Sequence, residues 1–324
     1  MIIAALLAAA VIAAMLVGWW YLHSDKVEQP DLPGAVEVGS LLHDGLRRSW
    51  RSYVPAAKAE KPALLLLLHG SRGNGERMRA NTTFYGFDVL AEREGFIAVY
   101  PDGYQQHWND CRANANYAAN LQNIDDVGFL STLVQLIAAD HGADLARVYV
   151  AGMSNGGHMA YRLGFEAPQL VAGIAAVAAN LPVEANLDCE RTGRPVAAMI
   201  MNGTADPVNP YNGGLVEIAG DASRGEVLSS AATADYWAAL AGYENDAQYQ
   251  VWPQRAPDDG TSVESTRWSG QGKVSVQLIS ILGGGHTVPN PVFSLPRILG
   301  ATSHQLDGAE VIWSFFNEAG PVAP

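Results

Sequence analysis

The chain has few cysteines and no surplus of positive charge, and each shortage excludes a class of protein. Two cysteines among 324 residues, Cys111 and Cys189, can form one disulfide at most, so this is not a disulfide-framework protein. Neither lies in a Cys/His spacing that binds zinc, and we expect no metal site. The 33 acidic and 20 basic residues give a net charge of −13, which argues against a nucleic-acid partner because phosphates require a positive surface.

Charged residues are scarce, at 16%, whereas hydrophobic residues make up 48% of the chain. This composition excludes a disordered or collagen-like protein, because enough apolar surface is available to offset the entropy lost on folding. The length fits either two average domains or one α/β domain with insertions.

The longest hydrophobic run occupies residues 2–22 and contains no charged residue. At ~1.5 Å per residue such a helix is just long enough to cross ~30 Å of hydrocarbon. The run ends in Trp19, Trp20 and Tyr21, which are typical of a membrane interface, and mostly acidic residues follow. We expect residues 1–22 to be an anchor that leaves the following domain outside the cytoplasm, or a cleaved signal peptide; a buried helix is a third possibility.

The remainder predicts a linker over residues 23–35 and a single α/β domain over 36–324, because strand-like runs alternate with helical ones. Leu64–Leu68 is uniformly apolar, which is typical of a parallel strand covered on both faces. An antiparallel hairpin over 40–55, turning at Asp44-Gly45, is expected ahead of this sheet.

The other expected strands share apolar runs bounded by turn residues: 96–100, 148–151, 174–178, 197–201 and 274–282. Helices are expected to begin at Asp125 or Asp126 and at Ser229 or Ser230, with a last helix over 309–318. The fold class is therefore α/β, with a mostly parallel sheet and helices on both faces.

Gly152-Met153-Ser154-Asn155-Gly156 lies between an apolar strand and an amphipathic helix. This G-x-S-x-G pattern is typical of a nucleophile elbow, in which a tight strand-to-helix turn lifts the serine hydroxyl above the sheet. Glycine is needed on both sides because a Cβ there would collide with neighbouring backbone. We therefore predict that Ser154 is a nucleophile.

A nucleophilic serine needs a base and an acid that orients it, and both follow downstream in the order Ser, Asp, His. Asp206 lies in the loop that follows the strand 197–201, and His286 follows a glycine run after the strand 274–282. We predict that Asp206 is the acid and His286 the base. The alternatives are Asp258 or Asp259 for the acid and His304 for the base.

Such a site also needs donors for a developing oxyanion. The backbone N–H of Asn155 follows the nucleophile, and the loop after the early strand offers the N–H of Ser71, with Arg72 as the alternative. His69 in that loop is expected to be structural.

Trp108 lies in a polar loop after the strand 96–100, where we predict that it contacts substrate; the alternative is a core tryptophan that fixes the loop. If the domain is exported, Cys111 and Cys189 are expected to be joined, free buried thiols being the alternative.

Several motifs in order, from about Gly39 to Phe316, resemble the polyhydroxybutyrate depolymerase and feruloyl esterase-like branch of the α/β-hydrolases. They are Leu68-His69-Gly70, Tyr100-Pro101-Asp102-Gly103, Trp108-Asn109-Asp110, Asp125-Asp126-Val127-Gly128-Phe129, Gly152-Met153-Ser154-Asn155-Gly156-Gly157, Gly203-Thr204-Ala205-Asp206-Pro207 and Gly284-Gly285-His286. The sequence departs from the family in the oxyanion loop, where Ser71-Arg72 replaces the frequent Gly or Cys.

The resemblance implies an exported serine carboxylic ester hydrolase with the triad Ser154, Asp206 and His286. It implies small or polymeric ester substrates, of polyhydroxyalkanoate, feruloyl, acetyl or aryl type, with no cofactor and no obligate protein partner. The membrane is a partner only if the N-terminal segment stays attached. The alternatives are a serine peptidase of the same fold and a catalytically silent cell-surface binding protein.

Overall fold

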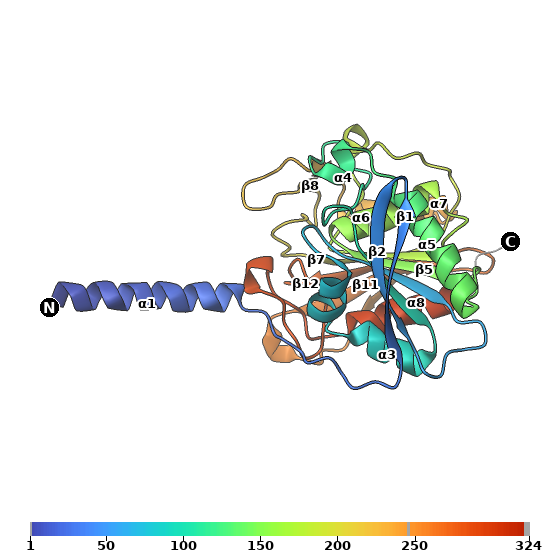
Figure 1. The fold of residues 1–324 in the computed structure, drawn as a ribbon. Coiled ribbons are helices and arrows are strands. Elements are labelled where there is room, and N and C mark those ends of the chain that lie inside the picture. The colour runs from blue at the N-terminus through green and yellow to red at the C-terminus, as the bar shows by residue number, and fades with distance from the viewer. Residues whose placement is uncertain (1, 245–246, 321–324) are drawn as a thin grey trace.

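A ten-stranded sheet runs through the centre of the computed structural model, which describes residues 2–244 and 247–320 (Figure 1). The strand order is β1-β2-β4-β3-β5-β6-β7-β12-β11-β10, parallel from β4 to β12 and antiparallel at both edges. The strands are β1 (Ala35–His43), β2 (Leu46–Val54), β3 (Leu64–Leu68), β4 (Ile97–Pro101), β5 (Val148–Met153), β6 (Gly173–Val177), β7 (Ala197–Gly203), β10 (Gln248–Val251), β11 (Ser262–Trp268) and β12 (Val276–Leu282). A second, small sheet pairs β8 (Gly214–Leu215) with β9 (Glu226–Val227).

Helices cover both faces of the sheet (Figure 1), as predicted. One face packs on α5 (Asp126–His141), α6 (Asn155–Glu166) and α7 (Ser230–Leu240), and the other on α3 (Gly86–Glu94) and α8 (Gly308–Ala319). The shorter helices are α2 (Gly75–Arg77), η1 (Met78–Thr82), α4 (Ala118–Leu121), η2 (Glu184–Asn186), η3 (Pro257–Asp259) and η4 (Arg297–Leu299).

Strand β3 shows why its five leucines are uniformly apolar. Leu64, Leu66 and Leu68 belong to the core on the α5/α6 face, whereas Leu65 and Leu67 belong to the core on the α3/α8 face. Successive side chains of a strand point to opposite faces, so a central strand covered on both sides needs an apolar residue at every position.

Several local predictions are confirmed. The hairpin turns at Asp44-Gly45, where both residues have positive φ, 48° and 75°, as a two-residue turn of this type requires. Side chains of Asp125 and Ser229 cap α5 and α7. The first strand of the hairpin begins at Ala35, five residues earlier than predicted, and neither the edge strand β10 nor its neighbour β11 was predicted. All four residues of β10 are exposed, so it lacks the apolar run by which the other strands were found.

Residues Ile2–Leu22 form helix α1, which stands clear of the sheet and its helices (Figure 1). Within the part of the chain that the structure describes, no helix combines the length and the apolar character that a membrane crossing requires. The C-terminal end of α1 adjoins η4, where the Arg297 guanidinium lies 4.6 Å from the Trp20 ring centroid. Asp25 and Ser294 then exchange two hydrogen bonds, of 3.1 and 2.7 Å, so the segment after α1 is fixed to the globular body.

Candidate active site

Ser154 occupies a strained turn between β5 and α6. Its φ and ψ are 57° and −121°, a conformation that non-glycine residues rarely adopt. A Cβ on Gly152 would lie 2.2 Å from the carbonyl oxygen of Gly156, and a Cβ on Gly156 would lie 2.2 Å from that of Leu68. The two glycines therefore allow the turn, which has the geometry predicted for a nucleophile elbow.

Asp206 and His286 are brought together as the sequence predicts. The Nδ1 atom of His286 lies 2.8 Å from Oδ2 of Asp206, and both side chains are buried. The other carboxylate oxygen accepts hydrogen bonds from the backbone N–H groups of Val208 and Asn209, at 2.7 and 2.8 Å. The carboxylate is thus held with one oxygen directed at the imidazole, and Nδ1 is the ring nitrogen that donates.

Close backbone contact between two loops positions Asp206 and His286 next to each other. Strands β7 and β12 are parallel neighbours, so their C-terminal loops emerge side by side. A Cβ on Gly203 would lie 2.2 Å from the carbonyl oxygen of Gly284, and one on Gly285 would lie 2.2 Å from that of Leu299. The backbone N–H of His286 donates to Leu299 O at 2.6 Å. The glycines therefore permit the close approach that places the imidazole.

A cavity of about 550 Å³ opens at this edge of the sheet, and Ser71, Ser154 and His286 line it. Asp206 is not part of its wall and lies on the Nδ1 side of His286. A larger hollow of about 720 Å³ lies between β10 and α8 and is lined by none of these residues. We therefore locate the candidate site in the smaller cavity.

The oxyanion donors can be compared in the structure. Asn155 is the first residue of α6, where backbone N–H groups have no partner within the helix. The alternative donor, the N–H of Arg72, instead donates to Gln106 O at 2.9 Å. This bond leaves the N–H of Ser71, on the cavity wall, as the better second candidate.

His69 has hydrogen bonds that agree with a structural role. Its Nε2 accepts from the N–H of Gly103 at 2.9 Å, and its Nδ1 donates to Gly70 O at 2.8 Å. Burial lowers the pKa of His69 to about 4, so the ring is neutral at physiological pH. Both ring nitrogens are thus used to hold the loop that presents Ser71.

The alternative acid and base form a separate cluster. Asp259 accepts a hydrogen bond from the backbone N–H of His304 at 2.7 Å, rather than from its ring. The His304 ring bonds to Asn290 O and to the hydroxyl of Ser294. Neither Asp259 nor His304 lines the cavity that contains Ser154, and Asp258 does not line it either.

The prediction that Trp108 faces the substrate is wrong. Its side chain is 0% exposed and does not line the cavity. The indole Nε1 donates to His69 O at 3.0 Å, and its backbone N–H donates to the Asn155 side chain at 2.8 Å. The loop folds inward because both polar groups of Trp108 find partners in the core, which is the alternative that the sequence left open.

Trp108 belongs to a buried network behind the N-terminus of α6. The Asn155 amide donates to Trp108 O at 3.0 Å and to the Asp110 carboxylate at 2.6 Å. Asp110 also forms an ion pair of 2.6 Å with Arg112. Burial alone would raise the pKa of Asp110, but the Arg112 guanidinium outweighs it and holds the pKa below its usual range. The network fixes the residue whose backbone N–H is the candidate oxyanion donor.

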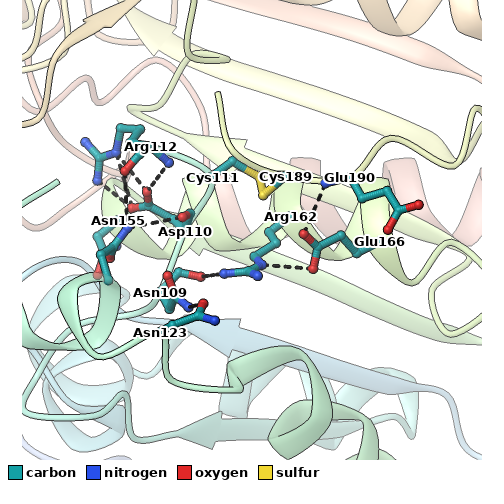
Figure 2. Close-up of a disulfide and its surroundings, with 11 residues drawn as sticks. Asn109, Asp110, Cys111, Arg112, Asn123, Asn155, Arg162, Glu166, Cys189 and Glu190 are labelled. Atoms are coloured by element: carbon teal, nitrogen blue, oxygen red, sulfur yellow. Dashed lines mark hydrogen bonds and ion pairs between the residues drawn. A yellow bond between two sulfur atoms is a disulfide. The ribbon is translucent and has the colours of Figure 1, made fainter. Parts of the chain in front are cut away.

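A disulfide lies next to this network (Figure 2) and joins Cys111 to Cys189, as expected for an exported domain. Cys111 stands between Asp110 and Arg112 in the chain, so the bond attaches their loop to a segment 78 residues away. Arg162 of α6 lies beside the disulfide and donates to Asn109 O at 2.8 Å (Figure 2). The loop is therefore tied at two points beside the candidate site.

Sequence reasoning missed several residues of the cavity wall, among them Ser24, Ile218 and Arg224. Ser24 follows α1, and the other two lie between β8 and β9. None adjoins a motif, and no periodicity marks these loops, so only the tertiary structure brings them to Ser154. Among the described residues, no group of three metal-ligating side chains lies close enough to hold a metal ion.

Known proteins resemble this chain over most of its length. The sequence pattern of the family described as Esterase PHB depolymerase matches residues 48–235. NocK of Nocardia uniformis subsp. tsuyamanensis, whose name places it among esterases, is 29% identical over 84% of this chain and 79% of its own length. Feruloyl esterase B of Neurospora crassa is 31% identical over 43% of this chain and half of its own length.

Among solved structures, the acetyl xylan esterase from Aspergillus awamori superposes with a TM-score of 0.55 at 18% identity. The match covers 87% of this chain and 99% of that one. At this identity the likeness concerns the fold, and it agrees with the α/β-hydrolase architecture predicted from the sequence.

Proposed function

The chain belongs to the PHB depolymerase family of esterases and is a carboxylic ester hydrolase, and we propose that it works through an acyl-enzyme on Ser154. The observation that carries the proposal is the strained Ser154 in one cavity with His286, whose Nδ1 is bonded to Asp206. This arrangement supplies a nucleophile, a base and a group that fixes the base.

In the proposed reaction, Nε2 of His286 takes the hydroxyl proton as Oγ of Ser154 attacks the ester carbonyl carbon. The carbonyl electron pair moves to oxygen, and the N–H groups of Ser71 and Asn155 stabilise that oxyanion. Its collapse breaks the ester bond, and His286 returns the proton to the leaving alcohol. Water then attacks the acyl-enzyme by the same route and releases the acid. Asp206 keeps Nδ1 protonated, so that Nε2 is free to accept.

We propose polyhydroxyalkanoate-type, feruloyl, acetyl or aryl esters as substrates, either small or polymeric. The support is the family description together with the names of a feruloyl esterase and an acetyl xylan esterase among the similar proteins. The proposed steps require no cofactor, because every proton and electron pair is carried by the protein, the ester and water.

We further propose that residues 36–324 form one catalytic domain and that it is exported. The Cys111–Cys189 disulfide supports export, because such bonds persist in oxidising compartments. Residues 1–22 would then be a cleaved signal peptide or an anchor, although no helix among the described residues has the length and apolar character of a membrane crossing, and 23–35 would be the linker. Fractionation of the producing cells and sequencing of the mature N-terminus would distinguish membrane-held protein from protein cleaved beyond Leu22. Full-length protein confined to the cytoplasm would contradict export.

Labelling with a fluorophosphonate tests the proposed nucleophile. The wild type should incorporate one label and lose hydrolysis of p-nitrophenyl acetate, whereas Ser154→Ala should do neither. Ser131→Ala is a matched control, because this serine lies on α5 and bonds to Val127 O outside the cavity. Labelled and inhibited Ser154→Ala protein would assign the nucleophile to another residue.

A further inference from the structure

The cavity that contains Ser154 is bordered by arginines, although the chain as a whole is acidic. Arg72, Arg77 and Arg224 line it, and no aspartate or glutamate does. The whole chain carries a net charge of −13, so this wall is opposite in sign to the rest of the protein. A cavity of one sign attracts and orients a ligand of the other.

Arg224 is built into the wall. Its residue is 6% exposed, and its Nε is buried without a hydrogen-bond partner among the described residues. Asn186 holds its backbone through a bond of 2.9 Å to Arg224 O, and Asp221 accepts from Nη1 at 3.1 Å through its side chain. A buried donor without a partner is costly, so an acceptor that reached this N–H would be stabilised by it.

Arg72 lines the same cavity as Arg224. Burial lowers the pKa of His107, and the charges of Arg224 and Arg72 lower it further, so both guanidinium groups act on the same imidazole. Arg77 in turn donates to Arg72 O at 2.8 Å. Arg72 follows Ser71, the candidate oxyanion donor, in the chain, and both residues line the cavity that contains Ser154.

We propose that the preferred ester carries a carboxylate away from the scissile bond, and that Arg224 and Arg72 bind it. Arginine forms paired, charge-assisted hydrogen bonds with carboxylates. Two kinds of ester present this group: a half-ester of a dicarboxylic acid, on the acyl side, and an acylated hydroxy acid, on the alcohol side. The inference rests on the proposed ester hydrolysis at Ser154.

Paired substrates that differ only in charge test the inference. Monoethyl glutarate and ethyl glutaramate place carboxylate or carboxamide on the acyl side; 3-acetoxybutyrate and 3-acetoxybutyramide place it on the alcohol side. In at least one pair, kcat/KM should be about ten-fold higher for the carboxylate, equivalent to about 1.4 kcal/mol. The pair that shows the preference identifies the side on which the carboxylate is bound.

Arg224→Gln should remove most of this preference for the carboxylate over the carboxamide ester, because glutamine keeps polarity without charge. Arg72→Gln should reduce the preference less. Arg267→Gln is a matched control, because this arginine pairs with Glu318 outside the cavity. In the wild type, raising the salt concentration from about 0.05 to 0.5 M should lower kcat/KM for the preferred carboxylate ester only, as screening requires.

Equal turnover of charged and neutral esters by the wild type, or a preference unchanged in Arg224→Gln, would overturn this inference while leaving ester hydrolysis intact. If no ester were hydrolysed and p-nitrophenyl acetate were also stable, the proposed function would fail together with it. If Arg224→Gln does not fold, the preference of the wild type for carboxylate over carboxamide esters and its dependence on salt still test the inference.

Discussion

Two polar regions meet at the N-terminus of α6 and differ in how their polar atoms are bonded. We call them the cavity wall (Ser71, Ser154, Arg224 and His286) and the buried support (Trp108, Asp110, Arg112 and the Asn155 side chain). In the support, side chains bond to one another; Asp110 alone meets Arg112, Asn155 and Tyr117. In the wall, Arg224 Nε has no partner among the described residues, and Ser154 is strained.

This difference in bonding indicates that the buried support contributes mainly to stability and the cavity wall mainly to catalysis. Polar groups that satisfy one another inside a protein stabilise it, whereas groups directed at a cavity await a ligand. Substitutions in the wall should therefore change turnover more than melting temperature, and substitutions in the support should do the reverse. The following experiments test that division, starting with the largest expected effect.

Removing a member of the proposed triad should give the largest change. Ser154→Ala, Asp206→Asn and His286→Ala should each lower kcat on p-nitrophenyl acetate by ~10⁴-fold or more, because the three residues act as a unit. Melting temperature should change little. His304→Ala is the matched control, because this histidine is the alternative base and does not line the cavity that contains Ser154. It should keep nearly normal turnover. Normal activity in His286→Ala, with loss in His304→Ala, would transfer the role of base to His304.

Trp108→Ala tests the support. Because the side chain is fully buried, we expect the free energy of unfolding to fall by about 3 to 5 kcal/mol, as for other large core residues. Large and small acyl esters should be affected alike. Trp108→Phe retains most of the volume and should be milder. A selective loss on bulky acyl esters at unchanged stability would restore the contact with substrate that the sequence predicted.

Removal of the disulfide should have the next largest effect, which is a loss of stability in the buried support. Cys111→Ser with Cys189→Ser should cost about 2 to 4 kcal/mol of stability, because the bond closes a long loop and restricts the unfolded chain. Turnover at low temperature should persist, since the side chains of the proposed triad do not depend on this bond. Thermal unfolding with and without reductant provides the measurement. An unchanged melting temperature in the double variant would show that the Asp110–Arg112 ion pair and the hydrogen bond from Arg162 hold this loop without the disulfide.

Acidification should give the most gradual effect. His69 has a pKa of about 4 when folded, below its usual value, so between these two values the unfolded chain binds the extra proton. Stability should therefore fall as pH drops through that range, by at most about 1.4 kcal/mol per pH unit from this residue. Burial also lowers the pKa of His158, which acts in the same direction.

His69→Gln should reduce the slope, because glutamine can both donate and accept without titrating. Urea unfolding at about pH 7 and about pH 5 compares the two proteins. Equal slopes would mean that His69 is not the titrating group. Asp110 should not contribute in this range, because its pKa is held below the usual range and its stabilisation is lost only in stronger acid.

The sequence determined the parts of the molecule that depend on near neighbours in the chain. The five leucines of β3 required a strand covered on both faces, Asp44-Gly45 required a tight turn, and Gly152 and Gly156 allowed the conformation of Ser154. Each is a local consequence of side-chain period or of a missing Cβ, so a short window of sequence contains it.

The choice between rival residues was decided by tertiary structure alone. Asp206 and Asp259 each lie near a histidine, and only the packing of β7 beside β12 places a carboxylate against a ring nitrogen rather than a backbone N–H. Trp108 was misplaced because a polar loop does not reveal whether its tryptophan points inward. Arg224 reached the cavity from a loop without a motif. Contacts between residues far apart in the chain depend on how the whole sheet assembles, and no local pattern contains that information.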